Sequence, residues 1–290
     1  MSELEELEAF ENSKKKILSN VQKKIIGQTD IVEELLIAIF AGGHILLTGV
    51  PGLAKTLMIT TLSQTMDLDF KRIQFTPDLM PSDIIGTEIL ELNRSTGEKE
   101  MKFLKGPIFS NIILADEINR TPPKTQSALL QAMQEKEVSV GNTTFMLDEP
   151  FFVMATRNPI EQEGTYPLPE AQLDRFLFNL VMDYPDHASE LDIVEKTTSE
   201  TSGRVEKVLD AEYILKARDL IKKIPVTRAL VEYAVNIVRS SRPEDEASSE
   251  FIRESVSWGA GPRAGQNLII SAKINALFHG RKTPDYTDVN

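Results

Sequence analysis

The chain of 290 residues is predicted to be an α/β protein, with a parallel sheet flanked by helices, β-hairpin inserts and a small all-α C-terminal domain. Three observations predict this fold. A short apolar strand at 44–49 runs into a glycine-containing loop and a helix-compatible stretch at 56–64. A second apolar strand at 112–115 ends in two carboxylates. From residue 188 onward the chain has helical periodicity, interrupted by polar loops.

The composition narrows the class of protein. Hydrophobic residues make up 41% of the chain, enough for a sizeable buried core. No apolar run is long enough to cross a membrane and residues 1–16 lack the apolar centre of a secretory signal, so we expect a cytoplasmic protein. The absence of cysteine excludes disulfides and thiolate metal sites. A net charge of −12 repels phosphate backbones, which makes nucleic acid an unlikely partner and favours proteins.

The first 41 residues are predicted to form two helices. A charged amphipathic helix covers 1–24, and Thr29 and Asp30 are expected to cap an apolar helix at 31–41. Between them lies a turn that contains Ile26 and Gly27. This turn lies just upstream of the glycine loop, so it either lines a pocket for an adenine base or is a plain structural turn.

The loop from Gly49 to Thr56, GVPGLAKT, fits the phosphate-binding pattern G-x-x-x-x-G-K-[ST] except that Ala54 replaces the second glycine. Backbone N–H groups of such a loop bind phosphate, the lysine bridges the β and γ phosphates, and the hydroxyl binds Mg²⁺. Ala54 fits the pattern if it takes a helical φ and ψ in the first turn of the following helix, and the pattern fails only if φ must be positive there. The alternative is a strand-turn-helix junction with a chance lysine. The residues predicted to bind ATP here are Ile26, Gly27, Gly49, Val50, Pro51, Gly52, Leu53, Ala54, Lys55, Thr56 and Leu57.

Asp116 and Glu117 follow the buried strand 112–115, at the end where open parallel sheets bind ligands. Asp116 is predicted to hold Mg²⁺ together with Thr56, and Glu117 to orient or polarise the water that attacks the γ phosphate. Asn158 follows another apolar strand at 151–156 and is predicted to help hold that water. Its alternative role is to cap a turn before Pro159.

Two hairpins are predicted as inserts. One pairs 87–92 with 99–105 about a turn at 93–97, and the other pairs 137–140 with 143–147 about Gly141 and Asn142. The first hairpin either extends the sheet or touches a substrate. Between the two hairpins, a helix is expected at 124–135.

Five segments, GVPGLAKT, IILADEINR, ATRNP, LPEAQLDRF and WGAGPRA, resemble in this order the MoxR family of AAA+ ATPases, and the resemblance extends from Ile25 onward. It implies that Lys55 and Thr56 belong to Walker A, and Asp116 and Glu117 to Walker B. By the same resemblance Asn158 is sensor 1, Arg175 an arginine finger, Arg263 sensor 2, and Arg120 a second intersubunit cation.

An arginine finger acts on the nucleotide of a neighbouring subunit, so Arg175 in that role implies a ring of copies. The alternative is a surface ion pair between Arg175 and Asp174 or Glu170.

The resemblance also suggests two domains, an ATP-binding core at 1–204 and a helical lid at 205–290. Helices are expected at 188–198, 211–223, 227–242 and 265–279, and 285–290 is expected to begin another helix of a lid that is clipped at its C-terminus. Arg263 precedes the last full helix, from where it could close on the γ phosphate.

The expected function is Mg²⁺-dependent ATP hydrolysis in a homo-oligomeric ring, by the resemblance a hexamer. The resemblance implies chaperone-like remodelling, activation or assembly of a partner protein, often one with a von Willebrand factor A domain. Two alternatives are a nucleic-acid motor and a nucleotide-gated scaffold that binds ATP but hydrolyses little of it.

Overall fold

The computed structural model describes residues 3–92, 99–160, 164–198 and 203–289. Its centre is a five-stranded sheet in the order β2-β5-β8-β1-β9, in which every neighbouring pair is parallel. The strands are β1 (Ile45–Gly49), β2 (Phe70–Gln74), β5 (Ile112–Asp116), β8 (Phe152–Arg157) and β9 (Phe178–Met182). The predicted α/β class and parallel sheet are therefore confirmed.

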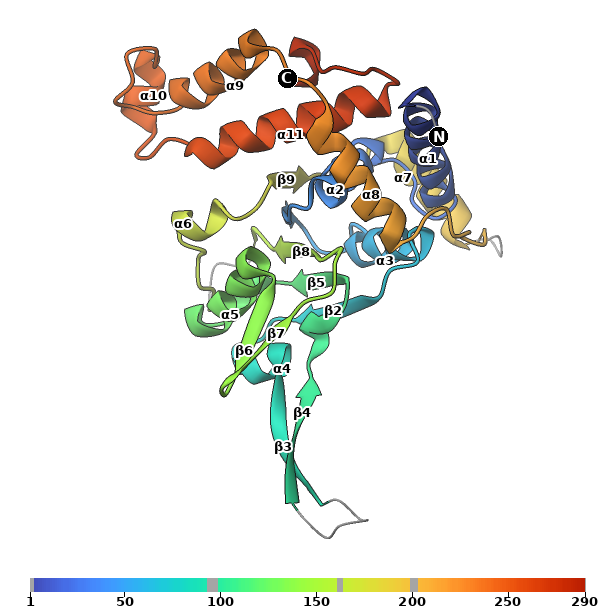
Figure 1. Cartoon of the computed structure of the whole chain (residues 1–290), viewed down its shortest axis with the longest axis vertical. Coiled ribbons are helices and arrows are strands. Elements are labelled where there is room, and N and C mark those ends of the chain that lie inside the picture. Colours follow the sequence, from blue (N-terminus) through green and yellow to red (C-terminus); the bar gives the residue numbers. More distant parts are fainter. Residues whose placement is uncertain (1–2, 93–98, 161–163, 199–202, 290) are drawn as a thin grey trace.

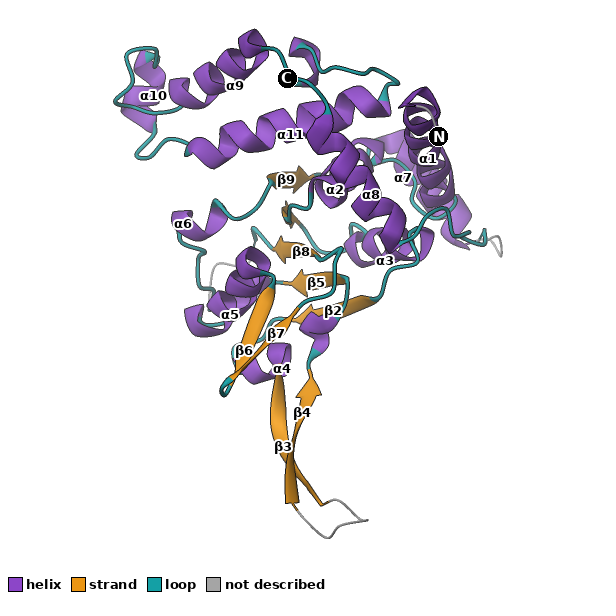
Figure 2. Ribbon diagram, viewed as in Figure 1, coloured by secondary structure: helices purple, strands orange, loops and turns teal. Residues whose placement is uncertain are grey.

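Helices cover both faces of this sheet (Figure 2). The helices in the described part of the chain are α1 (Glu3–Gln22), α2 (Thr29–Ala41), α3 (Lys55–Thr65), α4 (Pro81–Ile85), α5 (Pro123–Glu135), α6 (Glu170–Leu173), α7 (His187–Thr198), α8 (Ala211–Lys223), α9 (Arg228–Ser240), α10 (Glu250–Ser255) and α11 (Pro262–Phe278). Those that pack against the sheet include α1, α2 and α3 on one face and α5 on the other.

The central strands are buried on both faces, which explains why their sequences are continuously apolar rather than alternating. In β1, Ile45 and Leu47 pack in one core cluster with residues of α1, α2 and α3. Leu46, which points to the opposite face, packs in a second cluster with residues of α5. The sheet is thus the middle of three layers, and its strand ends are free to form a site.

Both predicted hairpins are present. The first is β3 (Gly86–Leu92) with β4 (Lys99–Lys105), and its predicted turn at 93–97 lies outside the described residues. The second is β6 (Glu137–Val140) with β7 (Thr143–Met146). Phe103 of β4 stacks on Phe145 of β7 with ring centroids 4.6 Å apart, so the bases of the two hairpins are joined. Figure 1 shows β3 and β4 projecting from one end of the molecule and α9, α10 and α11 at the other.

Several predicted boundaries differ from the structure. Helix α2 begins at Thr29, so Gln28 is its N-cap, in a left-handed conformation and without a side-chain cap bond. The segments that form α4 and α10 were not predicted as helices because each is only one or two turns long. The helix start predicted at 285–290 is present as one 3-10 turn at Tyr286–Asp288, with Asp285 as its N-cap.

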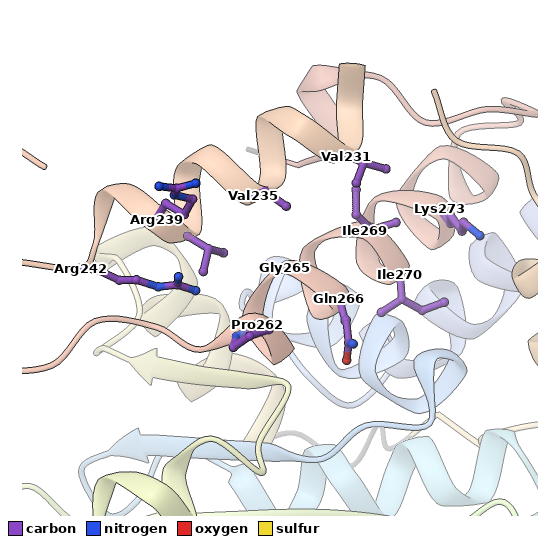
Figure 3. A pocket seen from close by; sticks show the side chains of 11 residues that line it. Val231, Val235, Arg239, Arg242, Pro262, Gly265, Gln266, Ile269, Ile270 and Lys273 are labelled. Carbon is purple, nitrogen blue, oxygen red and sulfur yellow. The ribbon is translucent and has the colours of Figure 1, made fainter. Parts of the chain in front are cut away.

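The C-terminal helices pack on the core and on each other. Ile214 of α8 and Leu277 of α11 belong to the same core cluster as α2. Farther out, α9 and α11 leave a hollow of about 580 Å³ between them, lined mainly by aliphatic side chains such as Val231, Val235 and Ile269 (Figure 3). None of the helices in the described part of the chain is long and apolar enough to cross a membrane.

His44, just before β1, is a buried polar residue with both ring nitrogens engaged. Its Nε2 lies 3.1 Å from the carbonyl oxygen of Met133, and its Nδ1 accepts the N–H of Val153 at 3.0 Å. Nδ1 can accept only in the neutral ring, whose Nε2 then donates to Met133. Burial lowers the pKa of His44 to about 4, against the opposing effect of the Met133 hydrogen bond.

This buried imidazole predicts a loss of stability in mild acid. The unfolded chain binds a proton at His44 below pH 6.5, whereas the native chain binds it only near pH 4, so stability falls as the pH drops between these values. We expect the free energy of unfolding to fall by about 2 kcal/mol between about pH 6.5 and 4.5 through this residue. Urea unfolding across this range would measure it. In His44→Gln this part of the slope should vanish, and an unchanged slope would contradict the assignment.

Candidate functional site

The carboxyl ends of β1, β5 and β8 meet at one edge of the sheet, because the three strands are parallel and are consecutive in the sheet. They open on a cavity of about 530 Å³. Its lining comes from the loop after β1, from β2, and from the residues that follow β5 and β8: Gly49, Pro51, Gly52, Leu53, Ala54, Lys55, Thr56, Leu57, Arg72, Asp116, Glu117, Thr156 and Asn158. The glycine loop, the Asp-Glu pair and Asn158, which are predicted from separate sequence patterns, therefore line the same cavity.

Two glycines shape the loop between β1 and α3. A Cβ on Gly49 would lie 2.8 Å from the carbonyl oxygen of Met182, so no larger residue fits without moving the backbone. Gly52 has a φ of 89°, which side chains disfavour. Lys55, the first residue of α3, donates to the carbonyl oxygen of Gly49. Burial lowers the pKa of Lys55, whereas the nearby carboxylates of Asp116 and Glu117 raise it.

Ala54 has the positive φ that the sequence interpretation held to be incompatible with the phosphate-binding pattern, and not an unstrained helical conformation. It is the N-cap of α3, with φ 57° and ψ 23°, in the left-handed region. The loop needs this turn to reverse its backbone before the helix, as anion-binding loops do. A non-glycine residue in this region is strained by roughly 1 to 2 kcal/mol.

Ala54→Gly should therefore stabilise the protein. Relief of the strained φ outweighs the added entropy of glycine in the unfolded chain, for a net gain of about 1 kcal/mol in the free energy of unfolding. The urea midpoint would measure it. The matched control is Ala128→Gly in the interior of α5, where the same change should cost about 1 kcal/mol. A loss of stability in Ala54→Gly would show that the loop is not strained at this residue.

The carboxylate of Asp116 is held from two sides. Thr156 of β8 donates its hydroxyl to Oδ1 at 2.6 Å, and Arg72 of β2 donates to Oδ2 through Nε at 3.1 Å and Nη2 at 2.6 Å. Neither Arg72 nor Thr156 was predicted as a site residue. The alternation at 70–75 predicts a strand. The pairing of β2 with β5 depends on the order of strands in the sheet, and no local sequence pattern predicts that order.

Glu117 is also held by two neighbours. Its Oε2 accepts from Nε2 of Gln74 at 2.8 Å and from Nη1 of Arg120 at 3.0 Å. Its backbone is left-handed, with φ 58°, and its N–H donates to the Thr156 hydroxyl at 2.9 Å. A strained carboxylate residue at the rim of a cavity is typical of a functional position. Arg120, predicted as an intersubunit cation, contacts Glu117 of its own chain.

Asn158 lies beside the carboxylate strand, as predicted, because β8 pairs with β5. Its side chain is buried and lines the cavity. Its Oδ1 accepts the N–H of Ile160 at 3.1 Å, which is the turn-capping interaction of the alternative interpretation. The cap therefore orients the amide without removing it from the cavity.

A second cavity of about 310 Å³ adjoins the first and shares five of its residues, Pro51 to Ala54 and Leu57. Its other walls are largely apolar and include Ile25, Ile26, Tyr184, Ile193 and Val194. Of the residues predicted to bind ATP in the loop and in the turn before α2, Gly27 and Val50 do not line either cavity. A Cβ on Gly27 would lie 3.2 Å from the Ser189 hydroxyl, and Val50 packs against the core.

Arg175 and Arg263 do not line either cavity. Arg263 donates to the backbone oxygen of Asp174 at 3.0 Å and to its Oδ2 at 3.2 Å. With Asp174 engaged by Arg263, the guanidinium of Arg175 has no hydrogen bond or ion pair with any residue that the structure describes.

The donor set suits Mg²⁺ bound together with phosphate. Thr56 and Asp116 offer a hydroxyl and a carboxylate oxygen to the same cavity, and Mg²⁺ prefers oxygen ligands. No cluster of three or more His, Asp or Glu side chains that could hold a metal occurs among the described residues. Mg²⁺ would therefore need the oxygens of a nucleotide as well, as it does in phosphoryl-transfer sites.

A phosphate-binding loop opposite an Asp-Glu pair, at the carboxyl edge of a parallel sheet, defines a P-loop nucleotide-binding protein of the ATPase class.

Known proteins similar to this chain belong to the same class. Residues 44–178 match the model of the ATPase family associated with various cellular activities (AAA). A solved structure described as a candidate ATPase from Cytophaga hutchinsonii is 47% identical, with a TM-score of 0.89 over 98% of this chain and 86% of that one.

Two curated relatives extend the likeness over nearly the whole chain. Chaperone MoxR1 of Mycobacterium tuberculosis is 42% identical over 96% of this chain and 72% of its own length. Uncharacterized protein YeaC of Bacillus subtilis is 45% identical over 92% of this chain and 79% of its own. The chain therefore belongs to the MoxR family of AAA+ ATPases.

Proposed function

We propose that the chain hydrolyses ATP with Mg²⁺ at this site, in a ring of identical copies, and couples turnover to the remodelling, activation or assembly of a partner protein. The observation that carries the proposal is the convergence of Lys55, Thr56, Asp116, Glu117 and Asn158 on one cavity. Family membership supports nucleotide binding, and the name of the MoxR1 relative supports chaperone-like work.

Each residue has a role that follows from its chemistry. The backbone N–H groups of the loop and the ammonium of Lys55 bind phosphate oxygens. The Thr56 hydroxyl and the Asp116 carboxylate hold Mg²⁺, which when bound neutralises developing charge on the phosphates. Glu117 accepts a hydrogen bond from the attacking water and orients it, and the Asn158 amide supplies a second contact to that water.

The apolar second cavity suits an adenine base. Its floor is shared with the phosphate loop, so a base there is contiguous with phosphates at Lys55. Ile26 lines this cavity, and Gly27 lies in the adjoining turn.

The remaining roles involve the ring and the lid. Arg175 supplies the finger to the site of the next copy, in a ring that by family resemblance has six members and works with a partner that carries a von Willebrand factor A domain. Residues 1–204 form the ATP-binding core and residues 205–290 the helical lid. Arg263 leaves Asp174 when the lid closes and then contacts the nucleotide as sensor 2.

Lys55→Ala should abolish tight ATP binding, which makes it the direct test of the site. Removal of a half-buried cation from its phosphate contacts costs about 3 kcal/mol, or about a hundredfold in Kd. Isothermal titration with MgATP would measure it. The control is Lys216→Ala on the exposed face of α8, which should leave the Kd unchanged. Equal affinity in the two variants would place the nucleotide elsewhere.

A further inference from the structure

Arg72 ties the edge strand β2 to the residue predicted to hold Mg²⁺. In the sheet register Arg72 lies opposite Leu114, two residues before Asp116, so its side chain reaches along β5 to the strand end. Nε and Nη2 both donate to the same oxygen of Asp116, at 3.1 and 2.6 Å. Nη2 also donates to Oε1 of Gln74 at 2.6 Å, which holds the guanidinium in place.

The carboxylate of Asp116 therefore has a protein partner on each oxygen. Thr156 takes Oδ1 and Arg72 takes Oδ2. The Thr156 contact is neutral, whereas the Arg72 contact is an ion pair that cancels the charge of Asp116. The Asp116 side chain is 18% exposed and that of Arg72 is 48% exposed, so the arginine has room to leave and the carboxylate does not.

A guanidinium and Mg²⁺ compete for such an oxygen. Both are cations that need its negative charge, and placed side by side they repel each other. We propose that Arg72 is a positioning residue that sets the Mg²⁺ affinity of this site, because it occupies Oδ2 of Asp116, an oxygen that it must yield if Mg²⁺ is to bind there with nucleotide. This inference rests on the function proposed above.

The test is the effect of Mg²⁺ on ADP affinity. For each protein, isothermal titration gives the Kd for ADP in EDTA and in saturating Mg²⁺. The Kd in EDTA divided by the Kd in Mg²⁺ measures how strongly Mg²⁺ supports nucleotide binding. ADP has no γ phosphate, so neither hydrolysis nor a contact from residue 72 to that group enters the ratio. A loss of positive charge near the site weakens the binding of ADP more than that of MgADP, which carries less negative charge, so the ratio is read against a variant that loses a neighbouring charge.

We expect the ratio to rise about fivefold in Arg72→Gln, a modest effect because the pair is partly exposed. Arg72→Lys keeps the charge but loses the two-pronged contact, and its ratio should be intermediate. The matched control is Lys71→Gln, which removes one charge from the residue before Arg72 in β2. Lys71 has no hydrogen bond or ion pair with the described residues, so the ratio of Kd values in this variant should equal that of the wild type.

An equal or lower ratio in both Arg72 variants would overturn the inference, since it would mean that Arg72 does not oppose Mg²⁺ or that it prepares Asp116 for the metal. Failure of the wild type to bind ADP, or binding that Mg²⁺ does not strengthen, would instead overturn the proposed function and the inference with it. Thermal melting in EDTA shows whether Arg72→Gln is folded. If it is not, the ratio of Arg72→Lys tests the inference.

Discussion

Glu117→Gln should reduce ATP turnover by about a thousandfold while ATP still binds. The substitution keeps the shape of the side chain but removes the negative charge that polarises the attacking water, a contribution typically worth 10²- to 10⁴-fold. Lys55, Thr56 and the loop that contact the phosphates are untouched, so the Kd for ATP should change little. Steady-state phosphate release and ATP titration on the same sample would measure both quantities.

The matched control for this prediction is Glu135→Gln, at the exposed C-terminal end of α5. It removes the same charge from the chain but lies outside the cavity, so turnover should be unchanged. Retained ATP affinity excludes a structural effect of Glu117→Gln through its contacts with Gln74 and Arg120. If Glu117→Gln turned over ATP at the wild-type rate, Glu117 would not be the residue that activates water.

Arg175→Ala should reduce turnover by at least about a hundredfold, because a guanidinium delivered to the transferring phosphate of a neighbour is worth 10³- to 10⁵-fold in related sites. Within its own chain Arg175 is outside both cavities and without a polar partner among the described residues, so its loss should leave stability and ATP affinity nearly unchanged. The control is Arg228→Ala, whose side chain is 84% exposed on α9.

Mixing variants distinguishes action in trans from action in cis. Arg175→Ala lacks the finger and Lys55→Ala lacks the phosphate contact, so each protein alone should be inactive. In a randomly mixed ring, about a quarter of the sites combine an intact loop from one copy with an intact finger from the next, and about that fraction of the turnover should return. Mixtures that stay inactive at every ratio would count against a shared site.

The core of the fold could be predicted because its signals are local. The apolar strands at 45–49 and 112–116, the loop with Lys55 and the carboxylates after Ala115 are each legible within about ten residues. The two hairpins have turn signals of their own. The position of Asn158 beside the carboxylates was also predictable, because carboxyl ends of neighbouring parallel strands share an edge.

What could not be predicted depends on contacts between distant segments. The ion pair of Arg72 with Asp116 spans 44 residues, and that of Arg263 with Asp174 spans 89. Both depend on which strand or helix lies beside which, and an exposed arginine looks the same in sequence whichever carboxylate it meets. The left-handed Ala54 was missed for another reason, since a helix-compatible residue type indicated a helical backbone where the loop imposes its own.

Sharing of the site between copies is tested by ATP turnover per protomer against protein concentration, with Arg175→Ala alongside and light scattering to size both. We expect a turnover that rises with concentration as the ring assembles, and that the substitution abolishes without preventing assembly. A turnover per protomer that is constant with concentration and unchanged in Arg175→Ala would contradict a shared site. Negligible turnover at every concentration with tight ATP binding would contradict hydrolysis itself and favour a nucleotide-gated scaffold.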